Sequence, residues 1–99
     1  MNELLVSLKK SLGDLGSTDA SLDEYYNQML NMAKSDLETE DISATTLATD
    51  FGKTAIVLYA EALIKGQDIA SNPTLIYLKN KLSAITKGER YEKKEQAAK

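Results

Sequence analysis

The sequence predicts an all-α protein: a small domain resembling a four-helix bundle, followed by a charged, mobile C-terminal tail. Apolar residues recur at spacings of three and four over four segments, and no stretch alternates apolar and polar residues long enough for a convincing strand. Glycines mostly fall where a helix should stop. The 99 residues suffice for one domain rather than two. We expect a helical domain over residues 1–88 and the tail over residues 89–99.

The first helix is predicted from about Asn2 to Leu12. Leucines recur there at helical spacing and form one apolar stripe, made of Leu4, Leu5, Leu8 and Leu12. Gly13 and Gly16 should end this helix, because glycine is common just beyond a helix C-terminus. Residues 16–19 are expected to form the loop that follows.

The second helix is predicted over residues 19–37 or 22–37. Thr18 and Ser21 are both possible N-caps, and Ser21 with Glu24 matches a capping box, in which each side chain satisfies the other residue's backbone amide. The spacing of apolar residues predicts one buried face. Its members are Leu22, Tyr25, Tyr26, Met29, Ala33 and Leu37, with Met32 widening it.

The third helix is predicted from about Ala44 to Lys65, with Ser43 or Thr45 as its N-cap and Gly66 as its stop. Its apolar residues form two neighbouring stripes, Leu47, Phe51, Ala55, Leu58 and Ala62 beside Ile56, Tyr59 and Leu63. Little polar surface remains over residues 55–64, and a helix that is apolar nearly all round is buried on several sides. We therefore expect it to be the central helix or to face another subunit as well.

The fourth helix is predicted to start after Asn72, a favourable N-cap, with Pro73 at the first helical position. A narrow apolar seam follows, formed by Leu75, Leu78, Leu82 and Ile85. Ile76 and Tyr77 lie off this seam. Gly88 is expected to end the helix.

The composition argues against an enzyme. The chain contains no cysteine and no histidine, which excludes disulfides and thiolate zinc sites and removes the commonest general base. No nucleophile, base and orienting group stand out together, and no glycine-rich phosphate loop is present. We expect no cofactor, no metal and no small-molecule substrate.

One cluster of acids leaves a metal site as an alternative. Four carboxylates fall within six residues, at Asp36, Glu38, Glu40 and Asp41, and hard cations such as calcium prefer such ligands. The spacing does not match an EF-hand loop, because Asp41 stands where that loop has glycine. Solvated acids in a loop between two helices are the simpler interpretation.

Charge is unevenly distributed along the chain. Residues 1–86 carry seven Lys or Arg and twelve Asp or Glu, whereas residues 87–99 carry five and three. The acidic body repels nucleic acid, while the basic tail either contacts nucleic acid or an acidic partner or is a solvated terminus.

A recognition helix of a helix-turn-helix is conceivable in the fourth segment, which offers Lys79, Asn80, Lys81 and Lys87. The acidic body and the lone arginine, Arg90, favour an ordinary solvated helix face instead.

The sequence also bears on location and on contacts. No apolar run approaches the roughly 20 residues that cross a bilayer, and the start lacks the features of a signal peptide, so we expect a cytoplasmic protein without membrane contact.

The candidate protein–protein contact residues are Ile76, Tyr77, Tyr91, Glu40 and Asp41. Tyr77 and Tyr91 fall off the main seam, and the third helix has apolar surface in excess. Packing within the monomer is the alternative for each of these residues.

The order of these features is similar to that of a known family. A short leucine-rich helix precedes Asp-x-x-Leu-x-x-Tyr-x-x-x-Met-Leu-x-x-Ala over residues 19–33. Glu40-Asp41-Ile42 and a long apolar helix ending Leu58-Tyr59-Ala60-Glu61-Ala62-Leu63 follow. The chain closes with Leu75-x-x-Leu78-Lys79-Asn80-x-Leu82-Ser83 and Lys87-Gly88-Glu89-Arg90-Tyr91. Over most of its length the chain thus resembles the head–tail connector, or DNA-packaging adaptor, proteins of long-tailed phages and prophages of Gram-positive bacteria.

The resemblance implies a structural role in the phage neck. Such proteins assemble as a ring beneath the portal, join the packaged head to the tail-completion proteins, and let DNA pass through as cargo. Their partners would be further copies of the chain, the portal protein and the tail-completion proteins, in the host cytoplasm during assembly and then in the virion. A head-to-tail contact closes into a ring when the rotation per subunit permits. The alternatives are a small helical DNA-binding or regulatory protein of a mobile element and a general interaction domain.

Overall fold

The computed structural model describes residues 3–13, 16 and 19–98, and describes side chains as far as Gly88. Five α-helices and no strands occur in this part of the chain, which confirms the all-α prediction. The helices are α1 (Glu3–Leu12), α2 (Ala20–Thr39), α3 (Ala44–Leu47), α4 (Asp50–Ile64) and α5 (Pro73–Ala98). The four helices expected from the sequence are all present, but the third is divided into α3 and α4.

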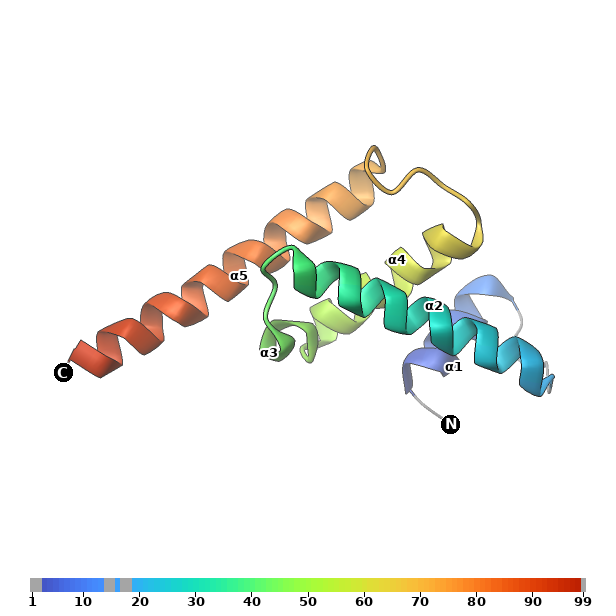
Figure 1. Ribbon diagram of the computed structural model, residues 1–99, viewed down its shortest axis with the longest axis horizontal. Coiled ribbons are helices and arrows are strands. Elements are labelled where there is room, and N and C mark those ends of the chain that lie inside the picture. The colour runs from blue at the N-terminus through green and yellow to red at the C-terminus, as the bar shows by residue number, and fades with distance from the viewer. Residues whose placement is uncertain (1–2, 14–15, 17–18, 99) are drawn as a thin grey trace.

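Helix α4 is the centre of the molecule, as predicted, because it contacts all four other helices (Figure 1). Seven of its 15 residues are buried: Gly52, Ala55, Ile56, Val57, Tyr59, Ala60 and Ala62. Four of these seven residues are glycine or alanine, so neighbouring helices approach closely on several sides. The central position therefore follows from the apolar composition of α4.

Helix α1 closes one side of the core. Leu5 and Leu8 are buried, and Gly13 adopts the left-handed conformation (φ +80°) that ends the helix. Lys9 is fully buried, with its Nζ 2.9 Å from a carboxylate oxygen of Asp23 in α2. Because removing one partner of such a pair leaves a buried charge uncompensated, this contact fixes α1 on α2.

Helix α2 differs from the prediction in its start and in its buried face. Asp19 is the N-cap, accepting hydrogen bonds from the backbone amides of the two residues at 21 and 22; Ser21 is not the cap, and Thr18 lies outside the described residues. Tyr25 and Met32 were predicted to be buried but are 41% and 49% exposed. The buried residues are Tyr26, Leu30, Ala33 and Leu37, whose spacing of four, three and four makes a narrower stripe than predicted.

The predicted helix from Ala44 to Lys65 breaks at residues 48 and 49. Ser43 caps α3, as expected, and the hydroxyl of Thr49 accepts a hydrogen bond from the amide of Gly52 and so caps a new helix, α4. Gly52 is therefore no helix stop. A Cβ on Gly52 would lie against the Thr46 carbonyl oxygen and 2.5 Å from the Cα of Leu47. Glycine thus allows the first turn of α4 to touch the backbone of α3.

The connection from α4 to α5 follows the sequence signals. Gly66 has a φ of +69°, its amide bonds to the Leu63 carbonyl, and the next amide, that of Gln67, bonds to the Ala62 carbonyl. These two bonds form a Schellman motif that ends α4. Asn72 caps α5 by accepting hydrogen bonds from the amides of residues 74 and 75, and α5 begins at Pro73, as predicted.

The expected stop at Gly88 is wrong, because the backbone of α5 stays helical to Ala98. Glycine costs a helix interior only about 1 kcal/mol relative to alanine, and Glu, Arg, Lys, Gln and Ala dominate the sequence that follows. The predicted boundary between a domain over residues 1–88 and a tail over residues 89–99 therefore falls inside a helix. In Figure 1, α5 continues away from the other helices to one end of a molecule 53 Å long.

Candidate protein–protein contact surface

The exposed side of α5 carries the first candidate contact residues. Ile76 and Tyr77 are 42% and 59% exposed, while their neighbours Leu75 and Leu78 are buried. Lys81, one turn beyond Tyr77, lies 3.5 Å from the tyrosine hydroxyl and 5.2 Å from the ring centroid of Phe51. The Lys81 Nζ also lies over the Tyr77 ring, 5.8 Å from its centroid, while more than half of the tyrosine stays exposed to solvent.

The opposite side of α5 is fixed to α3 by a chain of buried hydroxyl groups. The hydroxyl of Thr86 accepts a hydrogen bond from the amide of Ser43 (3.1 Å) and donates to the hydroxyl of Thr46 (2.9 Å). The hydroxyls of Thr46 and Ser43 are themselves 2.9 Å apart. Thr86 is fully buried and Ile85 only partly so, so Thr86 takes the seam position predicted for Ile85.

A second cluster ties α5 to the end of α2. Lys79 forms an ion pair with Glu40 (3.0 Å) and lies 5.3 Å from the ring centroid of Tyr59. The Tyr59 hydroxyl donates a hydrogen bond to the carboxylate of Asp36 (3.0 Å). Burial, reinforced by this bond and by the charges of Asp36 and Glu40, raises the pKa of Tyr59 to about 12. The cluster therefore holds a neutral tyrosine between the helices at any physiological pH.

The predicted contact residues do not form one surface. Glu40 is engaged within the chain by Lys79, and Asp41 adopts a left-handed conformation (φ +66°) in the turn after α2. Residues 77 and 79 differ by about 200° around a helix, so the side of α5 that meets Glu40 is not the side that presents Tyr77. The side chain of Tyr91 lies outside the described residues.

The exposed residues of α2 were not among the contact residues predicted from the sequence. Tyr25 and Met32 are seven positions apart and therefore share one side of the helix. The signal that would have found them is the buried set at positions 26, 30, 33 and 37, since both residues lie at least about a third of a turn from its midline. Tyr25, Met32, Ile76 and Tyr77 are the large apolar side chains that stand exposed in the part of the chain with described side chains.

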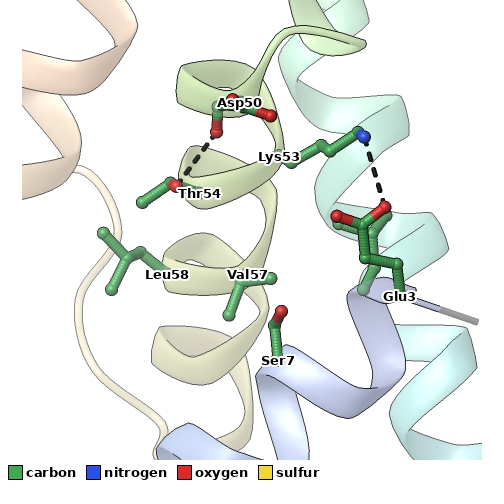
Figure 2. Close-up of a pocket in the computed structure, with 8 residues that line it drawn as sticks. Glu3, Ser7, Asp50, Lys53, Thr54, Val57 and Leu58 are labelled. Carbon is green, nitrogen blue, oxygen red and sulfur yellow. Dashed lines mark hydrogen bonds and ion pairs between the residues drawn. The ribbon is translucent and has the colours of Figure 1, made fainter.

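A shallow groove lies between α1 and α4, with a volume of about 280 Å³ (Figure 2). Leu4, Val57 and Leu58 contribute its apolar lining. At its edge Lys53 pairs with Glu3 (3.3 Å), so that one ion pair spans the two helices. Ser7 and Thr54 also line the groove, but the Thr54 hydroxyl donates to the backbone carbonyl of Asp50 rather than to a base.

The described residues offer neither a metal cluster nor a membrane helix. Among them, no three acidic side chains gather closely enough to hold an ion, and Asp36 and Glu40 of the acidic cluster are bonded to Tyr59 and Lys79. None of the helices described by the structure combines the length and the apolarity required to span a bilayer. The interaction that this arrangement supports is contact with another protein through the exposed apolar side chains.

Comparison with protein-family models, with curated proteins and with solved structures finds no significant match.

Proposed function

We propose that this chain is a structural assembly protein of a phage neck, which forms a ring between the portal and the tail-completion proteins. Its work is binding rather than catalysis, and DNA passes through the ring without being held. The proposal rests on the order of helices and motifs, which resembles that of head–tail connector proteins. It places the protein in the host cytoplasm during assembly and afterwards in the virion.

The observation that carries the proposal is the exposed pair Ile76 and Tyr77 on α5. A chain with a modest core gains by burying large apolar side chains, yet these two project to solvent beside the buried Leu75 and Leu78. Large exposed aromatic and aliphatic side chains mark protein contact sites. The acidic body supports a conduit for DNA, because a lumen that bound phosphate tightly would hinder passage.

A second candidate is a small DNA-binding or regulatory protein of a mobile element. It is favoured by the exposed lysines Lys81 and Lys87 of α5, which lie in a stretch without any acidic residue between Asp68 and Glu89. Lysine alone makes non-specific phosphate contacts, and affinity from such contacts falls steeply with salt. Binding of DNA that disappears at raised salt would be its signature.

Native mass spectrometry of the purified protein over a range of concentrations, with and without short duplex DNA, separates the two candidates. A discrete closed oligomer that ignores DNA is the result expected of a connector. A dimer that takes up DNA would replace the connector by the regulatory protein. A monomer that ignores DNA excludes the regulatory protein, and the connector is then tested by adding a purified portal ring.

A further inference from the structure

We propose that the exposed side of α5 in one copy docks on the exposed side of α2 in the next copy, which makes a head-to-tail contact. This inference rests on the proposed ring and specifies which surfaces join its subunits. It follows from three properties of the two surfaces: their exposed apolar side chains, their opposite charges and their similar lengths.

The α5 face is the set of exposed residues opposite the buried seam, namely Ile76, Tyr77, Asn80, Lys81, Ala84 and Lys87. At 100° per residue these six fall within an arc of about 140°, and its centre points away from the seam. The face carries two lysines and no acid, because the sequence has no Asp or Glu from residue 69 to residue 88. It is therefore apolar at one end and basic along its length.

The α2 face is the corresponding set on the other helix: Glu24, Tyr25, Gln28, Met32, Ser35 and Glu38, all of them exposed. It lies opposite the residues that α2 buries and carries two glutamates and no base. Lys34, the sole lysine of α2, falls about 90° or more from the middle of the face. The α2 face is thus apolar and acidic.

The two faces match in size and differ in sign. With a rise of 1.5 Å per residue, the α5 face is about 17 Å long and the α2 face about 21 Å, so one helix can lie along the other. The four large apolar side chains that stand exposed where side chains are described divide evenly, two on each face. Charges of opposite sign then suppress the pairing of either face with its own copy and favour the pairing of one with the other.

The arrangement of the helices makes the contact head-to-tail. Both α2 and α5 pack on α4, and each turns its face away from its own packed side. A contact between two different surfaces generates a ring or an open filament rather than a closed dimer. A single pair of helices buries less than the roughly 800 Å² per partner of a stable interface, so the pairwise affinity should be weak until each subunit has two neighbours.

Two variants that each disable one face test the contact. The first replaces Tyr25 and Met32 by Gln, and the second replaces Ile76 and Tyr77 by Gln, which removes apolar surface while keeping a residue that favours helix. Analytical ultracentrifugation and native mass spectrometry measure the assembly, and circular dichroism checks folding. Neither variant should self-associate. An equimolar mixture should give a heterodimer that grows no further, because one intact α5 face and one intact α2 face remain.

A charge reversal on the α5 face can be compared with the same charge reversal at a lysine outside that face. Lys87→Glu should weaken self-association about tenfold at low salt, whereas Lys10→Glu, the same change at an exposed lysine of α1, should leave it unchanged. Restoration of assembly by mixing Lys87→Glu with Glu24→Lys would support a direct contact between the charged groups.

Several outcomes overturn the inference without touching the proposed function. If the wild-type protein forms a closed ring and either double Gln variant forms it too, the connector stands and these faces are not its interface. A mixture that gives no heterodimer even at the highest soluble concentration, where a weak pairwise contact is still populated, has the same meaning. If the α2 variant still dimerises, the α5 face pairs with itself. A wild-type protein that is monomeric at its highest soluble concentration refutes the pairing, and binding to a portal ring then tests the connector separately.

Discussion

Helices α4 and α5 are built from similar apolar residues but are buried in different ways. Helix α4 contacts every other helix and buries residues over about 220° of its circumference. Helix α5 buries a seam formed by Leu75, Leu78, Leu82 and Thr86, half-buries Lys79, Ser83 and Ile85 beside it, and presents the opposite side to solvent. Helix α4 therefore contributes most to folding, whereas α5 offers an exposed surface for contacts with other molecules.

The same contrast appears at a glycine in each helix. A Cβ on Gly52 in α4 would collide with the backbone of α3, while a Cβ on Gly88 in α5 would have no atom within 4 Å. Glycine is thus present for different reasons in the two helices. At Gly52 close packing requires it, whereas at Gly88 the helix merely tolerates it. Substitutions in the two helices should separate loss of folding from loss of contact.

The largest expected effect is that of Gly52→Ala. The added methyl group would force α3 and α4 apart, and overpacking of this kind at a backbone contact should lower the free energy of unfolding by about 3 kcal/mol. Chemical denaturation monitored by circular dichroism measures the change. An unfolding free energy equal to that of the wild-type protein would mean that α3 and α4 do not touch at this point.

The next effect concerns the hydroxyl chain that anchors α5. Thr86→Val keeps the shape of the side chain but removes its hydrogen bonds to the Ser43 amide and to the buried Thr46 hydroxyl, and losing a buried partner costs about 2 kcal/mol. Thr74→Val, at an exposed threonine of the same helix, is the control and should change stability by less than about 0.5 kcal/mol. Equal effects of the two substitutions would contradict the hydroxyl chain.

Tyr59 should make stability depend on alkaline pH. The folded-state pKa of about 12 exceeds the ordinary value of 10.0, so the native state holds the phenolic proton more tightly than the unfolded chain does. The stabilisation is complete below pH 10 and is lost as the pH rises toward 12. Comparison with Tyr59→Phe isolates this contribution, since the lysines titrate in both proteins. The stability of the wild-type protein relative to the variant should fall over this interval, and a constant difference would refute the bond to Asp36.

A smaller and opposite effect is expected at Gly88. Gly88→Ala meets no neighbouring atom and removes a flexible residue from a helix interior, so it should stabilise the protein by about 0.5 kcal/mol and raise its helix content. Thermal unfolding and the far-ultraviolet circular dichroism measure both changes. A loss of stability would indicate that the chain leaves the helix at Gly88.

The smallest effect on stability belongs to Tyr77. Tyr77→Ala removes an exposed side chain, so the unfolding free energy should change by less than about 0.5 kcal/mol while self-association weakens. Tyr26→Ala, at a buried tyrosine, should instead cost about 3 kcal/mol. A sharp fall in melting temperature for Tyr77→Ala, with unaltered assembly of the folded fraction, would place Tyr77 in the core.

Predictions from the sequence were most accurate where local chemistry decides. Gly13, Gly66, Asn72 and Pro73 mark helix ends because positive φ, a capping oxygen and a missing amide act within a few residues. The break at Thr49 had the same kind of local signal, a capping threonine, but the continuous apolar pattern around it masked that signal. Of the candidate contact residues, Ile76 and Tyr77 could be recognised as exposed because they fall off a clear seam.

The all-helical class and the helix ends that glycine and asparagine make could be predicted from local sequence, and residues 55–64 were expected either to be central or to face another subunit as well. The packing of the helices was needed to show which side of α2 is buried, that Thr86 rather than Ile85 completes the seam, and that Glu40 is held by Lys79. Periodicity locates an apolar stripe to within about one residue in either direction. The choice between neighbours such as Tyr25 and Tyr26 is made by the helices that pack against them, because only packing decides which side chain leaves water.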